Sequence, residues 1–261
     1  MRALSIAATG MMAQQTNVEV ISNNIANMNT TAYTSRRAEF NDLLYQNIRR
    51  VGSTSSDAGT IVPAGVQLGL GVKTAAVYRI TEAGSLVNTN NTLDLAIQGK
   101  GYFKIKLPTG DFAYTRDGSF QMSPTGQVVT HDGYTVQPGI TIPANATGVS
   151  INASGQVLVS TSGTVAQATV GQLALTVFPN DAGLSATGDN LFAETPASGA
   201  GQDSTPGQPG FGTTMQGFLE TSNVNSVTEV TNLVSAQRAY EMNSKVIQAG
   251  NEMMQTVVQL K

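Results

Sequence analysis

The chain contains no cysteine and no tryptophan, and it has a single histidine, His131, among its 261 residues. Without cysteine it forms no disulfide, thiolate metal site or cysteine nucleophile, and one histidine cannot supply a multi-histidine metal centre. Charged residues make up only 12% of the chain. No lysine or arginine occurs between Arg116 and Arg238, which argues against nucleic-acid binding, because that binding depends on neutralising phosphates.

Long apolar runs are also missing. No segment reaches the roughly 18 consecutive apolar residues that a membrane helix needs. The start of the chain is not typical of a cleavable secretory signal, because Gln14, Gln15, Asn17 and Glu19 interrupt any apolar core. We therefore expect any export to use a route without signal cleavage.

Motifs for catalysis are absent as well. His131 lies in a turn signal at residues 130–133, and no Gly-x-Ser-x-Gly elbow supplies a nucleophile. Residues 69–74 lack the glycine that must precede Lys73 in a phosphate loop, and residues 99–104 lack the third glycine of a dinucleotide fingerprint. The carboxylates are scattered among turns. We expect no catalytic residue, no metal, no cofactor and no small-molecule substrate.

What the sequence does have is a seven-residue spacing of apolar residues at both ends. The residues at this spacing are Leu4, Met11, Val18 and Ile25 near one end, and Leu233, Tyr240, Ile247 and Met254 near the other. Companion positions three residues further on hold Ala7, Gln14, Ile21 and Met28, and Ala236, Asn243, Gly250 and Val257. The spacing predicts long helices over residues 3–28 and 227–260 that pack side by side. Ser226 and Glu229 are typical of a capping box at the start of the second helix.

The middle of the chain is rich in strand patterns. Phe103, Ile105 and Leu107 alternate with lysines, and similar alternations follow at residues 157–159 and 173–177, with short turn signals between them. The predicted fold class is α+β. Two terminal helices pair as a coiled-coil-like layer, and an antiparallel all-β domain is inserted between them. The predicted divisions are 1–50 with 215–261 for the helical region, 51–74 for a linking segment, and 75–214 for the β domain.

The helical stripes are too narrow to stabilise isolated helices of this length. Four seam residues per helix bury too little apolar surface to offset the backbone entropy of ordering it. Lateral contacts on several faces, as in a polymer, supply more burial. We therefore expect both terminal helices to order on assembly and the central domain to fold alone.

Several segments resemble the flagellar rod and hook axial proteins. Residues 22–33 (SNNIANMNTTAY) are similar to the N-terminal signature of that family, and residues 220–225 (ETSNVN) and 236–245 (AQRAYEMNSK) to the C-terminal one. Residues 114–120 (YTRDGSF) and 126–129 (GQVV) resemble the shared β module. Ala32 stands where the family commonly has glycine. The signature residues of this chain are Asn23, Asn24, Asn27, Asn223, Asn225, Gln237, Arg238 and Tyr240.

Within the family, residues 43–50, 63–72, 140–146 and 171–175 are similar to the distal-rod branch. A proximal-rod or hook-type position on the same axis is the alternative interpretation. A β-domain adhesin with coiled-coil termini is a more remote one, since it leaves the asparagine-rich signatures unexplained. A periplasmic hydrolase is disfavoured because the carboxylates do not cluster.

The resemblance implies a structural protein, not an enzyme. Members polymerise into a hollow rod that spans the periplasm and transmits torque from motor to hook, with helices in the inner tube and β domains in the outer wall. The implied partners are further copies, the proximal rod proteins, the hook protein, the L-ring and P-ring proteins, the rod-capping protein and the flagellar type III export apparatus. Segment 51–74 is expected to reach adjacent subunits, so deleting residues 53–61 is expected to make filaments flexible.

Overall fold

A computed structural model describes residues 2–49, 64–161 and 167–259. The chain divides into two compact units. The first, which we call the helical unit, consists of Met1–Ala26, Arg36–Arg79 and Asn225–Lys261. The second, the β unit, consists of Asn27–Ser35 and Ile80–Val224. The α+β class is confirmed, because helices from both ends of the chain contact each other and flank a central antiparallel β region.

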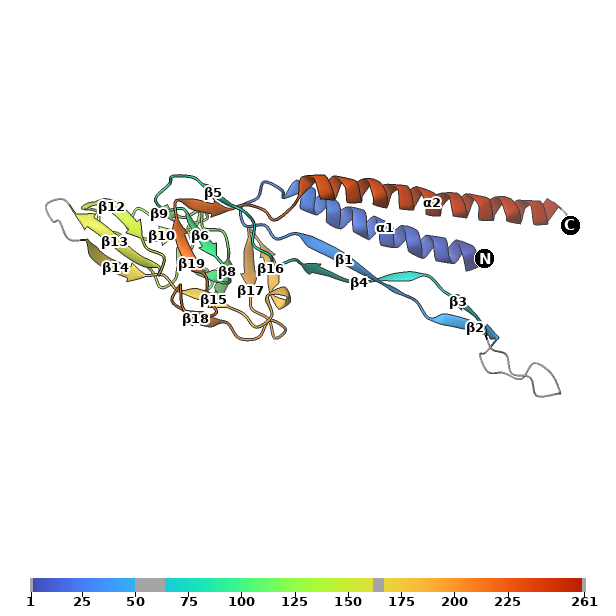
Figure 1. Ribbon diagram of the computed structural model, residues 1–261, viewed down its shortest axis with the longest axis horizontal. Coiled ribbons are helices and arrows are strands. Elements are labelled where there is room, and N and C mark those ends of the chain that lie inside the picture. Colours follow the sequence, from blue (N-terminus) through green and yellow to red (C-terminus); the bar gives the residue numbers. More distant parts are fainter. Residues whose placement is uncertain (1, 50–63, 162–166, 260–261) are drawn as a thin grey trace. The chain divides into compact units, whose positions relative to one another are not determined.

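The helical unit contains two long helices and a β ribbon (Figure 1). The helices are α1 (Arg2–Ala26) and α2 (Ser226–Gln259), and the strands are β1 (Arg36–Asp42), β2 (Tyr45–Arg49), β3 (Val66–Gly69) and β4 (Val72–Arg79). α1 and α2 lie side by side, and both predicted helices are confirmed to within two residues at each end.

The ribbon was not anticipated from the sequence. β1 pairs with β4 in antiparallel fashion, with a bulge between Glu39 and Phe40, and β2 pairs with β3. β1 and β4 pack against α1. Most side chains of these strands are exposed, so the alternation of apolar and polar residues that marks a half-buried strand is missing. Residues 51–63 of the predicted linking segment 51–74 lie outside the described residues. This stretch includes residues 53–61, whose deletion is expected to make filaments flexible.

The start of α2 differs from the predicted capping box. Asn225, not Ser226, caps the helix, because its Oδ1 accepts hydrogen bonds from the backbone N–H groups of Val227 and Thr228 at 3.1 and 3.2 Å. Glu229 does not return to the cap and instead accepts a hydrogen bond from Asn24 Nδ2 at 3.3 Å. The capping prediction was therefore wrong by one residue, and the carboxylate is used for a contact between helices.

The β unit is built from short antiparallel strands. They are β5 (Leu86–Asn88), β6 (Leu95–Gln98), β7 (Tyr102–Lys106), β8 (Phe112–Thr115), β9 (Gln121–Met122), β10 (Val128–Val129), β11 (Thr135–Val136), β12 (Ala146–Ile151), β13 (Gln156–Thr161), β14 (Ala168–Gln172), β15 (Leu175–Val177), β16 (Ser185–Gly188), β17 (Leu191–Ala193), β18 (Gln202–Ser204), β19 (Thr213–Gln216) and β20 (Phe218–Glu220), with a short 3-10 helix at Asp181–Gly183. The largest sheet runs in the order β16-β17-β8-β7-β11-β10-β9, and β12-β13-β14 form another. Phe103, Ile105, Val157, Val159 and Leu175 are buried together in one core. The apolar residues of the predicted alternating strands therefore face the interior, as expected.

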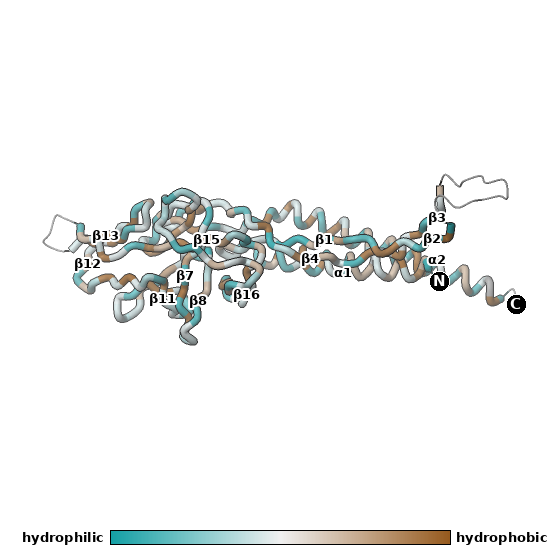
Figure 2. The backbone as a smooth tube through the Cα atoms, turned by 90° about the horizontal axis from the view of Figure 1, so that it is seen from below, coloured by the Kyte–Doolittle hydropathy of each residue, from teal (hydrophilic) through white to brown (hydrophobic). Residues whose placement is uncertain are grey.

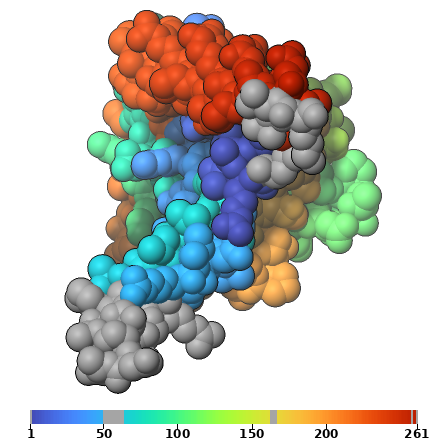
Figure 3. All heavy atoms as spheres, turned by 90° about the vertical axis from the view of Figure 1, so that its right-hand side faces the viewer, coloured from blue at the N-terminus to red at the C-terminus, as the bar shows by residue number. Residues whose placement is uncertain are grey.

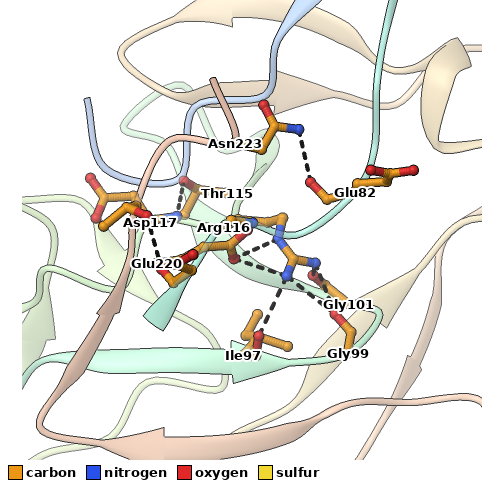
Figure 4. Close-up of polar contacts among 12 residues, drawn as sticks. Glu82, Ile97, Gly99, Gly101, Thr115, Arg116, Asp117, Glu220 and Asn223 are labelled. Carbon is orange, nitrogen blue, oxygen red and sulfur yellow. Dashed lines mark hydrogen bonds and ion pairs between the residues drawn. The ribbon is translucent and has the colours of Figure 1, made fainter. Parts of the chain in front are cut away.

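A buried ion pair joins separate parts of the β unit (Figure 4). The Arg116 guanidinium lies 2.9 Å from Glu220 Oε2, and the side chains are 7% and 2% exposed. Arg116 also donates to the backbone carbonyls of Ile97, Gly99 and Gly101 at 3.1–3.4 Å. Glu220 Oε1 accepts from the backbone N–H of Gly84 at 3.0 Å. Both buried charges are thus paired and hydrogen-bonded, as burial requires.

We expect Glu220→Ala to lower the free energy of unfolding of the β unit by about 3–5 kcal/mol, because it leaves the Arg116 charge buried without its carboxylate. Calorimetry of the full chain measures this loss. The control is Lys104→Met, which breaks the more exposed Lys104–Asp203 pair and is expected to cost at most about 1 kcal/mol. Equal losses in the two variants would contradict the role given to Arg116 and Glu220.

Candidate assembly surface

The helices α1 and α2 run antiparallel in a register set by three contacts. Near the end of α1, Asn24 Nδ2 donates to Glu229 Oε2. In the middle, a methyl group built on Gly10 would lie 2.8 Å from Asn243 Nδ2. Near its start, a methyl group built on Gly250 would lie 2.7 Å from Leu4 Cδ2. From the end of α1 toward its start, the contacts therefore fall at increasing residue numbers of α2, as in an antiparallel pair.

Small residues make this close approach possible. Ala7 and Ile21 of α1 and Ala236 and Gly250 of α2 are buried, and all four occupy the companion positions of the seven-residue pattern. Glycine and alanine leave room for the facing helix because they carry little or no side chain. Gly250, a weak helix former in the middle of a helix, is explained by its contact with Leu4.

The predicted seam residues flank this closely packed face. Leu4, Met11, Val18, Ile25, Leu233, Ile247 and Met254 are half-buried, and Tyr240 is exposed. In the single chain they therefore have free surface beside the contact between the two helices. Their role as contacts between subunits stays a prediction.

α1 is covered on two sides, whereas α2 is covered on one. α1 contacts α2, β1 and β4, while α2 packs mainly against α1. Figure 3 looks along the helical unit and shows α2 (red to orange) outermost, with α1 and the ribbon strands (blue to cyan) beneath it. Only Ala236 and Gly250 are buried among the described side chains of α2. Most of the surface of this helix is thus open.

The open surface of α2 carries apolar side chains in two stripes. Val227, Val230 and Val234 are three and four residues apart, and Met242, Val246 and Met253 are four and seven apart, so each set lies along one side of the helix. Figure 2 shows apolar residues (brown) recurring among polar ones along both helices. Exposed apolar stripes of this kind mark surfaces that other molecules cover.

The last turns of α2 run past the start of α1 (Figures 1 and 2). A hollow of about 490 Å³ lies there, lined by Asn251, Met254, Gln255, Val258 and Gln259. A second groove, of about 480 Å³, lies between α1 and the ribbon, where Met12, Thr16 and Glu19 face Leu43, Val72 and Lys73. Both hollows belong to the helical unit and add uncovered surface to it.

Three signature asparagines have a role within the chain. Asn24 pairs with the backbone of Arg36, donating to its carbonyl at 2.8 Å and accepting from its N–H at 2.9 Å. Asn223 accepts from the N–H of Ser35 at 2.7 Å and donates to the carbonyls of Ile80 and Glu82. Asn225 is the cap of α2. These side chains satisfy backbone groups where regular pairing ends.

Other signature residues lie closer to the surface. Asn27 accepts a hydrogen bond from Thr30 at the end of α1. Asn23 and, on α2, Gln237, Arg238 and Tyr240 are exposed. Ala32 follows with a φ of +54°, in the left-handed region that glycine adopts most readily.

The described residues include no candidate metal site and no candidate membrane-spanning helix. Among them, no group of three or more histidine, cysteine or carboxylate side chains is placed to hold a metal ion. His131 lies in the turn between β10 and β11, 55% exposed, beside Asp132. No described helix is long and apolar enough to cross a membrane. The molecule is defined instead by paired terminal helices with an open apolar face and an inserted β unit, as in a protein that assembles with others.

Comparisons with known proteins agree with this class. Residues 4–34 match the family described as flagella basal body rod protein, residues 96–159 the flagellar hook protein FlgE/F/G D1 domain, and residues 215–260 the flagellar basal body rod FlgEFG protein C-terminal region. The flagellar basal-body rod protein FlgG of Caulobacter vibrioides is 59% identical over the full length of both chains. Those of Agrobacterium fabrum and Bacillus subtilis are 51% and 39% identical, over at least 98% of each chain.

The chain therefore belongs to the flagellar basal-body rod protein family. It is a structural protein and not an enzyme, and its place is the rod of the basal body, which spans the periplasm. The identity of 39–59% to FlgG proteins, over at least 98% of this chain, confirms the distal-rod interpretation over the proximal-rod, hook-type and adhesin alternatives.

The antiparallel register is testable with introduced cysteines. In assembled protein, Gly10→Cys with Asn243→Cys is expected to form a disulfide within one chain, because a Cβ on Gly10 would lie 3.2 Å from Asn243 Cγ. No native cysteine competes for this disulfide. Gly10→Cys with Met242→Cys is the control, since Met242 lies on the open side of α2. Peptide mass spectrometry identifies the bond, and equal yields in both pairs would refute the register.

Proposed function

We propose that this rod protein polymerises by covering the open face of α2 with further copies of itself. The observation that carries the proposal is the packing of α2: 34 residues form a helix with two described side chains buried. A surface helix of a single folded domain normally hides a broad apolar stripe. Here the half-buried seam residues and both valine and methionine stripes are left for other subunits.

The half-buried positions favour contacts between copies over contacts within one chain. In the single chain Tyr240 is exposed, and the other seam residues are half-buried, so each keeps surface for a further contact: Leu4, Met11, Val18, Ile25, Leu233, Ile247 and Met254. A neighbouring helix in the groove beside the α1–α2 contact would touch seam residues from both helices at once. Gln237 and Arg238 lie exposed on α2 and add polar contacts to a neighbouring subunit.

In the rod that results, the helical unit supplies the inner tube and the β unit the outer wall. The low charge of α1 supports this, because this helix has only Arg2 and Glu19 as charged residues. The partners we propose are the proximal rod proteins, the hook protein, the L-ring and P-ring proteins, the rod-capping protein during growth and the type III apparatus that exports the chain without signal cleavage. We also propose that segment 51–74 links adjacent subunits.

Placing charge at the seam tests the mode of assembly. Leu233→Asp with Ile247→Asp is expected to abolish polymerisation, measured by sedimentation and electron microscopy, because each carboxylate would be buried unpaired between subunits. Leu233→Met with Ile247→Leu keeps the apolar contact and is expected to polymerise. The melting of the β unit should stay unchanged in both variants. Filaments formed by the double Asp variant would overturn the proposal.

The terminal helices are further proposed to order when subunits assemble, since α2 buries so little in one chain. A protease of broad specificity is expected to remove both ends of the monomer and to leave a core near residues 80–224. Trypsin is unsuitable because no lysine or arginine lies between Arg116 and Arg238. The same digestion of filaments should spare the ends. Helices that resist digestion in the monomer would show that they belong to its stable fold.

A further inference from the structure

Methionine is the only sulfur-containing residue of this chain. The sequence holds nine methionines, no cysteine and no tryptophan. Oxidants that react with sulfur therefore have only thioethers to attack. Reactivity of a thioether depends on its access to the oxidant, and the effect of a sulfoxide depends on whether assembly must cover it.

The exposed methionines lie on different surfaces. Met12 on α1 is 69% exposed and lies in the groove between α1 and the ribbon. Met242 and Met253 on α2 are 61% and 62% exposed and share one stripe with Val246. Met254, the direct neighbour of Met253, is half-buried near the end of α2. Met122 in β9 of the β unit is 56% exposed and lies outside the helical unit altogether.

We propose that Met242 and Met253 form an oxidation site, at which peroxides convert the thioethers to sulfoxides and so keep an unassembled subunit from polymerising. The proposal rests on the proposed function, because it requires the methionine stripe of α2 to be covered by another copy. Subunits already in a filament would be protected, since the same contact that the sulfoxide disrupts also shields the sulfur.

The reaction balances with one peroxide per methionine. The sulfur gives an electron pair to one oxygen of hydrogen peroxide, an S–O bond forms and the O–O bond breaks. After proton transfer the second oxygen leaves as water, so the sulfur is oxidised and the peroxide is reduced. A methionine sulfoxide reductase with dithiothreitol reverses the change: the oxygen leaves as water and two thiols become a disulfide.

The physical consequence follows from the polarity of the product. A sulfoxide is polar and has a strong hydrogen-bond acceptor, whereas the stripe that it shares with Val246 is apolar. Covering that acceptor without a donor opposes assembly. We expect the concentration of subunit needed for polymerisation to rise roughly tenfold or more when both methionines are oxidised.

The experiment uses the full chain, treated as monomer with hydrogen peroxide and then freed of it. Peptide mass spectrometry follows oxidation at each methionine, and sedimentation measures polymerisation relative to untreated protein of the same variant. The variants are wild type, Met242→Leu with Met253→Leu, and Met122→Leu as the matched control. We expect peroxide to inhibit wild type and the Met122→Leu variant alike, to spare the double variant, and to be reversed in wild type by the reductase.

Two results would overturn the inference. One is equal inhibition of the double variant and wild type, and the other is full polymerisation of wild type that carries sulfoxide at both positions. A further variant, Met242→Asp, distinguishes failure of the oxidation proposal from failure of the proposed subunit contact at α2. If Met242→Asp polymerises as wild type does, the stripe is not an interface and both proposals fail at this surface. If it blocks assembly while oxidation does not, only the oxidation site is refuted.

Discussion

The close packing of α1 against α2 is the contact on which the helical unit depends. It joins the two ends of the chain, and it uses alanine and glycine at the positions where the helices meet. Because small side chains bring the helices close, the contact occupies only a narrow face of each. The larger seam residues are left at its borders, half-buried and able to contact more than one helix.

The ribbon and the asparagines complete this arrangement. β1 and β4 cover a second side of α1, so α1 is the middle element of its unit. Asn24 then ties the end of α1 to Arg36 of β1 and to Glu229 of α2. One amide thus links three elements, which explains why a small polar residue is buried at the end of an otherwise apolar face.

The β unit solves a different problem. Its strands are short, so many of its residues lie in turns outside the sheets. The buried Arg116–Glu220 pair fixes one such turn, because it joins the backbone between β6 and β7 to β20. A cation with several donors is suited to this task because it satisfies three carbonyls and a carboxylate at once.

The helices could be predicted because a seven-residue repeat needs no information from the rest of the fold. The strands with alternating residues, such as Phe103 and Ile105, were predictable for the same reason. The ribbon was not, since its side chains are exposed and only its partner strand and α1 define it. Arg116 and Asn24 stood in recognisable signatures, but their partners lie up to 205 residues away.

The sequence by itself determined the two helices and the inserted β region, because hydrophobic periodicity is a local property. Only the tertiary structure decided which face of each helix is used within the chain. The repeat places larger and smaller residues on adjacent faces, and either could have been the contact. Close approach favours the smaller ones, Ala7, Ala236 and Gly250, and so leaves the larger apolar residues of α2 exposed or half-buried.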